Sequence, residues 1–192
     1  MEKRNWKHSV TLKQRMVLCL AAFFAAFALQ LALNGYQARA VQQVQDDQMG
    51  NFNAISRFQG GVESSISILE AYRWENGETE EMLEKLQAAC STSNAWLWRI
   101  RSNMDGLQNV SDEQWVLYGA VETTYGSYNT LLEELESYLS SGQEAKASQL
   151  YYNKVSVCGG YLSQYTMQLL KASILDAQTT YTEISELGER IA

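Results

Sequence analysis

The chain has 192 residues, a formal net charge of −7 at pH 7, no proline and one histidine, His8. The negative charge disfavours binding to nucleic acid, and the lack of further histidines leaves most hydrolase mechanisms without their usual general base. The sequence also has no phosphate-binding glycine loop, no Cys-x-x-Cys pair and no nucleophile elbow. It therefore predicts neither catalytic residues nor a bound metal or cofactor.

The first predicted element is a membrane-spanning helix. Residues 16–33 form an uncharged, mainly apolar run of 18, and about 17 to 25 helical residues cross a hydrocarbon core. A basic leader, residues 1–15, precedes this run, and basic flanks stay in the cytoplasm. We therefore expect a cytoplasmic leader over 1–15 and a transmembrane helix over 16–35. Residues 36–192 then lie outside the cytoplasm, in a protein that crosses the cell membrane once.

Two other interpretations of the apolar run stay open. Ala38-Arg39-Ala40 has the small-x-small form that signal peptidases prefer, although the core of a cleaved signal is usually only about 7 to 15 residues long. Cleavage at Ala40 would give a secreted helical protein, which the mass of the mature chain would reveal. The run is also compatible with a core helix of a soluble protein, against which the one-sided basic flank argues.

Residues 36–192 are predicted to form one acidic, all-α domain. They contain 10 basic and 21 acidic residues, which gives a net charge of −11, and their number suffices for a sizeable core. The absence of proline favours long helices. Acidic first turns and capping-box spacings mark helix starts, and Asn76-Gly77 and Asp105-Gly106 mark helix ends. The predicted helices cover residues 36–73, 79–104, 112–139 and 143–191.

Apolar residues repeat at heptad spacing in these segments. Such stripes pack against neighbouring helices at about 20 degrees, and short connections make successive helices antiparallel. We therefore expect an up-and-down antiparallel four-helix bundle. Gln48 and Asn51 interrupt the first stripe, and with Asp176 they indicate either a two-state stalk or a wet, splayed helix pair. The third segment has the clearest stripe: Tyr118, Val121, Tyr125, Tyr128, Leu132, Leu135 and Leu139.

Small residues gather at one predicted level of this bundle. Gly60-Gly61, Ser91 to Ser93, Gly126 and Gly159-Gly160 fall at nearly the same height, and each helical glycine costs about 1 kcal/mol relative to alanine. With the aromatic residues around them they indicate a small-molecule pocket. The alternative is that the aromatic residues simply fill the space that the glycines leave. The candidate ligand-binding residues are Phe58, Gly60, Gly61, Trp96, Tyr125, Tyr128, Gly160, Tyr161 and Tyr165.

Arginine and cysteine residues give further, weaker signals. Arg99 and Arg101 are compatible with an anionic ligand, but solvated surface arginines are the simpler interpretation. Cys90 and Cys158 fall on the stripes of two diagonal helices. Diagonal helices lie beyond the Cα separation of about 7 Å that a disulfide tolerates, so we expect two free thiols.

The order of these parts resembles a known family. A basic leader with Thr11-Leu12-Lys13-Gln14-Arg15, one apolar span and a helical domain that returns toward the membrane through residues 184–191 resemble the sensory N-terminal half of bacterial membrane-bound sensor histidine kinases. The four-helix ligand-binding region of chemoreceptors is similar in architecture. The resemblance covers nearly the whole chain and rests on architecture. It implies an extracytoplasmic sensing module of a two-component signal-transduction receptor, which acts as a homodimer and responds to a small ligand or an envelope protein.

The resemblance also implies an output that this chain does not contain. In that family a second span, a dimerisation helix with the phosphorylated histidine and an ATP-binding domain follow, so histidine kinase activity requires such a domain after Ala192. An external ligand there biases two packings of the helices. The alternative function is a single-pass helical protein that binds another membrane or envelope protein without sensing a ligand. Trp98, which lies off the second stripe, is a candidate for such an interface.

Overall fold

The computed structural model describes residues 12–72, 79–107 and 110–191, which form helices joined by short turns and, within these ranges, no strand. This confirms the all-α class. Apart from a helix start at Leu12, four residues before the predicted span, and a break in the last predicted helix, the described helix boundaries lie within two residues of the predicted ones. The predicted stop signal Asn76-Gly77 and residues 1–11 of the leader lie outside the described residues. The elements are α1 (Leu12–Ala71), α2 (Thr79–Gly106), α3 (Asp112–Ser140), α4 (Glu144–Leu150), a π-helical turn η1 (Tyr151–Val155) and α5 (Ser156–Ile191).

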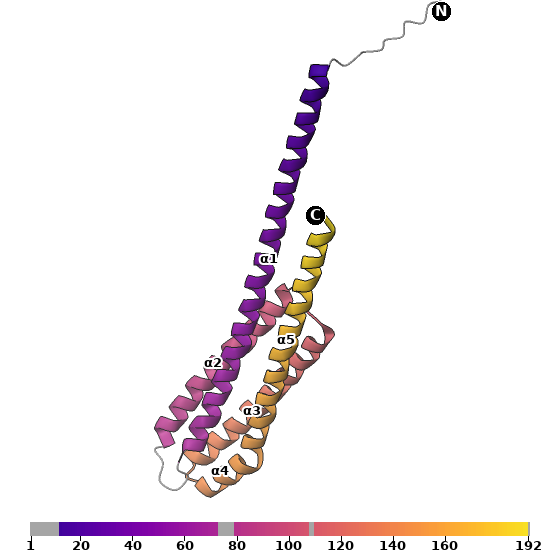
Figure 1. Ribbon diagram of the computed structural model, residues 1–192. Helices are drawn as coiled ribbons and strands as arrows, with labels where there is room; N and C mark the ends of the chain where they lie inside the picture. Colours follow the sequence, from indigo (N-terminus) through magenta and orange to yellow (C-terminus); the bar gives the residue numbers. More distant parts are fainter. Residues whose placement is uncertain (1–11, 73–78, 108–109, 192) are drawn as a thin grey trace, which may run out of the picture. The chain divides into compact units, whose positions relative to one another are not determined.

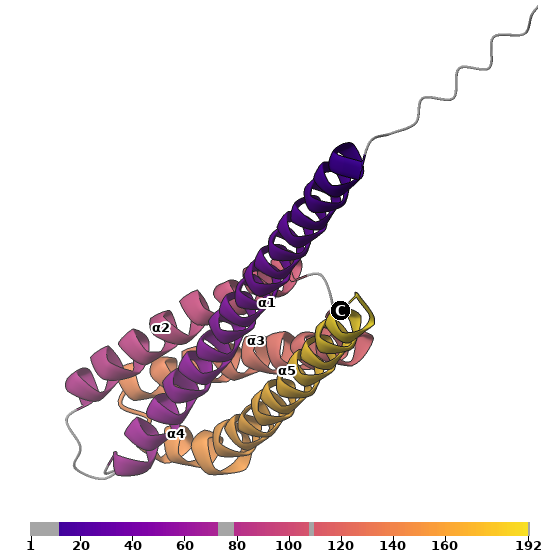
Figure 2. The same cartoon turned by 45° about the horizontal axis from the view of Figure 1, so that its top comes forward.

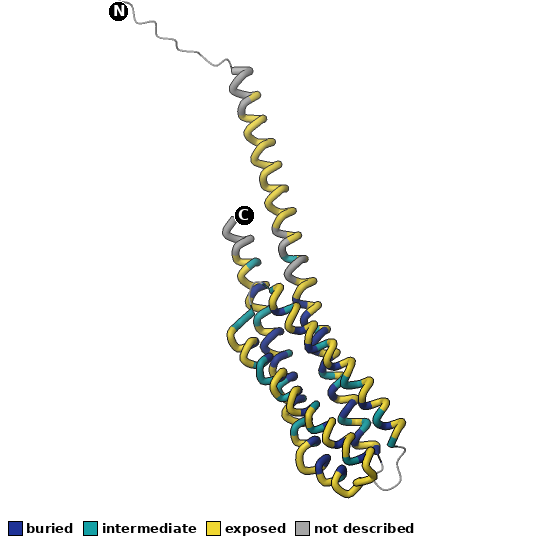
Figure 3. The backbone as a smooth tube through the Cα atoms, turned by 180° about the vertical axis from the view of Figure 1, so that it is seen from behind, coloured by how far each residue is buried: buried dark blue, intermediate teal, exposed yellow. Residues whose placement is uncertain are grey.

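The chain divides into two compact units, Met1–Gln43 and Val44–Ala192. In the described part of the first unit, α1 carries the apolar run. Cys19–Tyr36 is the one described stretch that is long and apolar enough to cross a membrane, with a mean hydropathy of 1.6. None of it is buried, and Figure 3 shows its residues as exposed. Its length and composition fit a membrane span, although a signal sequence also passes this test.

The second unit has one hydrophobic core. In Figures 1 and 2, α2, α3 and α5 run side by side, and α4 lies where the chain turns from α3 into α5. All seven residues of the predicted α3 stripe are buried, which confirms the heptad reading of that helix. In α2, buried residues also follow heptad spacing, and Leu83 and Cys90 on the same stripe pack against the core while partly buried. The buried residues of this stripe are Leu86, Ser93, Leu97, Ile100 and Met104.

Contacts between helices of the second unit give their relative directions. Contact partners run in opposite order along α1 and α5, because a higher residue number in α1 meets a lower one in α5. They run in the same order along α1 and α3. The pairs are Asn51 with Ser173 and Ile66 with Gly159 for α5, and Phe58 with Tyr125 and Ser65 with Tyr128 for α3.

The predicted single helix over 143–191 is wrong in one respect. Between α4 and α5, five residues, Tyr151–Val155, form a π-helical turn. The sequence of this turn, Tyr-Tyr-Asn-Lys-Val, contains no glycine or proline that would mark it. Two consecutive residues, Leu150 and Tyr151, are buried there, whereas consecutive positions of a regular helix point about 100 degrees apart. The wider π-helical turn therefore accompanies the burial of both neighbouring side chains in the core. Counting heptads in the sequence does not predict such a turn.

Candidate functional site

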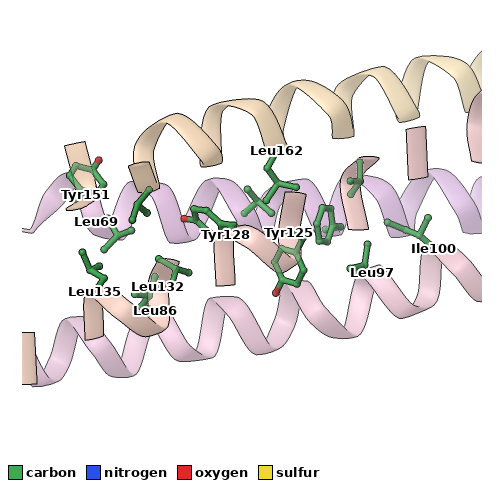
Figure 4. Close-up of a cluster of buried hydrophobic side chains, with 14 of the residues drawn as sticks. Leu69, Leu86, Leu97, Ile100, Tyr125, Tyr128, Leu132, Leu135, Tyr151 and Leu162 are labelled. Carbon is green, nitrogen blue, oxygen red and sulfur yellow. The ribbon is translucent and has the colours of Figure 1, made fainter. Parts of the chain in front are cut away.

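Three of the predicted site residues meet in the core. The rings of Phe58 and Tyr125 pack edge to face with centroids 5.2 Å apart. Tyr125 Oη donates to the Cys90 carbonyl oxygen at 2.8 Å, and Tyr128 Oη shares a hydrogen bond of 3.0 Å with Ser65 Oγ. Figure 4 shows the two hydroxyl oxygens pointing in different directions. Such contacts favour the interpretation in which these aromatic rings fill the core.

The remaining predicted residues are not gathered into one cavity. Trp96 and Tyr165 are partly buried and pack against the core. Tyr161 is 55% exposed, and Gly60 and Gly160 lie on the exposed surface with no neighbouring atom within 4 Å of an added Cβ. These three residues therefore face solvent rather than the aromatic core.

Two glycines do permit close approach between helices. A Cβ built on Gly61 overlaps Ser93 Oγ and lies 3.5 Å from Ser93 Cα. A Cβ on Gly159 would lie 3.0 Å from Ile66 Cδ1 and 3.3 Å from Tyr128 Cε2. In each of the two adjacent glycine pairs, one glycine therefore lies against another helix: Gly61 in the first pair and Gly159 in the second. An added Cβ meets nothing within 4 Å at the other glycines of this level, at positions 60, 126 and 160.

An open groove of about 410 Å³ lies between α2 and α3. Tyr125 is the one predicted site residue among the described residues that line it. Its charged and amide lining residues were missed because they flank the apolar stripes, where polar side chains are ordinary on any amphipathic helix. The described lining residues are Leu83, Leu86, Gln87, Cys90, Ser91, Asn94, Tyr125, Asn129, Leu132, Glu133 and Glu136.

One residue that lines the groove, Asn129, has a buried amide oxygen without a hydrogen-bond partner. Burial raises the pKa of Tyr125 to about 12, and a hydrogen bond from Asn129 opposes that rise. The Tyr125 hydroxyl already donates to Cys90, so the Asn129 amide N–H is the donor toward it. Asn129 Oδ1 is buried without a hydrogen-bond partner in the described structure. A buried acceptor in that state costs about 1 to 3 kcal/mol.

Three amide side chains form a second set of buried polar groups. They belong to Gln48, Asn51 and Gln114. Each of these residues is at most 5% exposed, and its side-chain oxygen has no hydrogen-bond partner among the described residues. We call these three residues the buried amides. Asp176 is better satisfied, because Gln114 Nε2 and the backbone N–H of Ser111 donate to its Oδ2 at 2.8 and 3.0 Å. The predicted polar interruption of the first stripe is therefore inside the core.

The two arginines that the sequence singled out lie outside the groove, and the two cysteines of the second unit form no disulfide. Arg101 Nη1 is 3.6 Å from Glu122 Oε1 with both side chains about half exposed, and Arg99 is exposed. Neither arginine is among the groove residues. Cys90 and Cys158 are free thiols, as the sequence favoured. Among the described residues, no three His, Cys, Asp or Glu side chains are grouped so that they could hold a metal ion.

Buried phenols and a partly buried thiol predict that the protein loses stability at alkaline pH. Burial raises the pKa of Cys90 to about 11 and those of Tyr118 and Tyr125 to about 12. The unfolded chain therefore releases these protons first as the pH rises above about 9. We expect the free energy of unfolding, measured with urea, to be level near neutral pH and to fall between about pH 9 and 12.

The Tyr125→Phe variant, which cannot ionise at this position, is the control for that measurement. It should show a shallower alkaline decline than the wild type. An identical decline in both proteins would mean that Tyr125 ionises as readily in the folded chain as in the unfolded chain.

No protein-family model, curated protein or solved structure matches this chain. A function therefore has to be argued from the chemistry and arrangement of its own residues.

Proposed function

We propose that this chain is a membrane-anchored, extracytoplasmic sensing module of a signal-transduction receptor, most closely the input domain of a sensor histidine kinase. The observation that carries the proposal is the apolar helix Cys19–Tyr36, which is wholly exposed and follows a basic leader. An exposed apolar surface of this length is unstable in water and stable in a bilayer. The basic leader favours a cytoplasmic N-terminus.

The sensing domain in this proposal is an up-and-down antiparallel four-helix bundle. The order of contacts along α1, α3 and α5 supports this topology, as do the short connections between helices. By analogy with the receptors that the chain resembles, the protein acts as a homodimer. Its external surface is acidic, with a net charge of −11 over residues 36–192.

Ligand sensing requires a place to bind and an element that can change its packing. The groove between α2 and α3 supports the first requirement, because it has polar side chains beside apolar ones in a space of small-molecule size. The buried amides support the second, since unpaired polar groups make one core packing less favourable relative to others.

Cysteine labelling tests the membrane orientation. In a chain whose own cysteines are replaced by alanine, Ser140→Cys places a thiol at an exposed end of α3 and Ser9→Cys places one in the leader. We expect a membrane-impermeant maleimide to label Ser140→Cys in intact cells and Ser9→Cys only after permeabilisation. The reverse pattern would invert the topology. A mature chain that begins after Ala40 would show a secreted protein instead.

A thermal-stability screen tests sensing. A small molecule that binds only the folded state raises its stability by about 2.7 kcal/mol at a hundredfold excess over Kd, which corresponds to a midpoint shift of several degrees. We expect such hits with the full chain in detergent micelles, and their loss in Ser91→Trp, which fills the groove from an exposed position of α2. Ser102→Trp, an exposed position on the same helix outside the groove, is the matched control.

The second candidate function is binding of another envelope protein without a ligand. One exposed aromatic residue favours it, because Trp98 is 69% exposed. Tryptophan is enriched at protein–protein interfaces. A screen with no groove-dependent hit, together with the expected topology, would place this function ahead of sensing.

A further inference from the structure

Helix α5 carries a second apolar stripe beside the one that packs in the core. Met167, Ile174 and Tyr181 are 39%, 40% and 63% exposed and are spaced seven residues apart, and Gly160 continues the series as an exposed residue. Each of these four residues directly follows a position that is buried in the core. Because consecutive helical positions point about 100 degrees apart, the four residues lie on a side of α5 that packs outside the core.

Four further residues complete a heptad pattern on this side of α5. Each lies three positions after a member of the first series, and all four are uncharged and partly buried. Apolar or small residues thus alternate at spacings of three and four along about 36 Å of helix. This is the spacing at which two helices pair with knobs-into-holes packing. The four residues are Ser163, Leu170, Ala177 and Ile184. We call the two series together the outer stripe.

The outer stripe is uncharged, although it belongs to a strongly acidic domain. Between Gly160 and Thr182, Lys171 is the one exposed charged residue of α5. In contrast, α3 exposes six acidic residues and contains no basic residue, and residues 36–192 have a net charge of −11. Like charges that face each other across an interface weaken association. Two copies of this domain would therefore repel each other through α3 but not through the outer stripe.

Lys171 does not oppose such a pairing of two copies. It lies four residues after Met167, at the position that flanks the outer stripe. In a parallel coiled coil, this flanking position lies opposite the flanking position on the other side of the partner helix. That position, five residues earlier in the sequence, is Thr166. The two Lys171 ammonium groups therefore do not face each other.

We propose that α5 pairs through its outer stripe with the same stripe of a second copy of this chain, as a parallel two-stranded coiled coil. In such a pair each residue of the stripe meets its own counterpart, so Met167, Ile174 and Tyr181 each contact an apolar partner. The parallel direction rests on the membrane anchor of the proposed function, because one membrane holds both copies in the same orientation. The proposal thereby names the surface through which the homodimer of the proposed function forms.

The size of the outer stripe predicts a dimer that depends on the membrane. A stripe of this length on a helix 10 Å wide covers about 360 Å² per copy, which is less than half of the roughly 800 Å² per partner in a standard interface. Such a contact is weak between free molecules. Anchoring in a shared membrane raises the effective concentration of the second copy. The pairing therefore has to be tested with the full chain in a bilayer.

Cysteine cross-linking of the full chain in membrane vesicles tests the surface. In a chain whose own cysteines are replaced by alanine, single cysteines are placed on the outer stripe or, as matched controls, at the exposed residue that follows each stripe position. Under mild oxidation we expect at least about fivefold more disulfide-linked dimer at the stripe positions, because only there do the two Cα atoms approach to within the range of a disulfide. The stripe variants are Met167→Cys, Ile174→Cys and Tyr181→Cys, and the controls are Gln168→Cys, Leu175→Cys and Thr182→Cys.

The pattern of cross-linking decides the outcome. Equal yields at stripe and control positions would mean random collision in the membrane and would overturn the proposal. A higher yield at the control positions would assign the pairing to another face of α5. A high yield at only one of the three stripe positions would mean crossed or antiparallel helices, and the parallel coiled coil would then be wrong.

A pair of charged variants tests whether the stripe causes the pairing. Ile174→Glu places two like charges against each other in the dimer, whereas Leu175→Glu places them on the neighbouring exposed position. In the Tyr181→Cys background we expect the first to lower the dimer yield at least about fivefold and the second by less than about twofold. Both positions are exposed, so far-UV circular dichroism should be unchanged in both variants. Equal losses would mean that added charge, rather than the stripe, weakens the pairing.

These outcomes separate the dimer surface from the sensing function. Groove-dependent hits in the thermal screen without preferential cross-linking would leave sensing in place and remove the outer stripe as the dimer surface. Preferential cross-linking in a chain whose labelling shows a cytoplasmic second unit would support the dimer surface and remove the extracytoplasmic sensor.

Discussion

Replacing Gly61 by leucine is expected to lower the free energy of unfolding by about 2 kcal/mol. An added Cβ at this position overlaps Ser93 Oγ and lies 3.5 Å from the Cα of the same residue, so a longer side chain meets the α2 backbone. Overpacking of a core position costs up to about 3 kcal/mol, and the better helix propensity of leucine returns somewhat less than 1 kcal/mol. Urea unfolding of the full chain in detergent micelles, followed by far-UV circular dichroism, measures the difference.

Gly60 is the matched control for this substitution. It neighbours Gly61 in the same helix, is exposed, and has no atom within 4 Å of an added Cβ. Gly60→Leu should therefore be neutral or stabilise the protein by up to about 0.8 kcal/mol. Equal effects at Gly60 and Gly61 would mean that α1 and α2 do not approach each other at Ser93.

Ser93 also offers a way to test the cause. Gly61→Ala should be destabilising in the wild type and less so when combined with Ser93→Ala, because the overlapping Oγ is then absent. Ser93 Oγ donates to the Ala89 carbonyl oxygen at 3.0 Å, so Ser93→Ala alone measures the loss of that bond. The coupling between the two substitutions isolates the helix–helix contact.

Heptad spacing predicted most of the core because period and burial are directly related in a helix. Every residue of the α3 stripe, from Tyr118 to Leu139, is buried. Capping-box spacings predicted helix starts, and at the start of α3 the Ser111 side chain does accept from the Gln114 backbone N–H at 3.2 Å. A local hydrogen bond therefore determines the start of this helix, and the residue spacing that makes it possible can be recognised in the sequence.

The site was less predictable, because adjacent residues of a helix point in different directions and counting residues does not fix the phase. The sequence predicts that Gly60 and Gly61 both belong to the site, yet only Gly61 faces another helix. Gly160 is a predicted site residue, whereas its neighbour Gly159 is the one that lies against Ile66 and Tyr128. The groove was missed for a different reason. Its polar residues flank the stripes and look like any solvated helix face until a neighbouring helix is in place.

Asn51→Leu is expected to raise the free energy of unfolding by about 1 to 3 kcal/mol. Asn51 is fully buried, its Nδ2 makes one long contact of 3.4 Å with Ser173 Oγ, and its Oδ1 has no partner among the described residues. Removing an unpaired buried amide recovers its desolvation cost, and leucine fills a similar volume. The same urea titration measures the gain, with Ser173→Ala as the control for the single long contact.

The opposite change is expected at Asp176, which has its partners. Asp176→Ala leaves the backbone N–H of Ser111 and Nε2 of Gln114 without their common acceptor. Hydrogen bonds to a charged group contribute about 1.5 to 3 kcal/mol. We therefore expect the free energy of unfolding of this variant to fall by at least about 1.5 kcal/mol. The contrast between Asn51 and Asp176 distinguishes polar groups that lower stability from polar groups that support the helix ends.

Together, Asn51→Leu and Asp176→Ala test whether the buried amides allow the core to change its packing. If Asn51→Leu stabilises the protein, its wild-type core tolerates an unfavourable group, and such a group reduces the energy gap to a second packing. The variant should then reduce any ligand-induced change in the distance between spin labels on α1 and α5 within the second unit. If Asn51→Leu destabilises the protein, the Asn51 amide is well satisfied in solution. The core is then adapted to one packing, and a two-state mechanism through this residue is excluded.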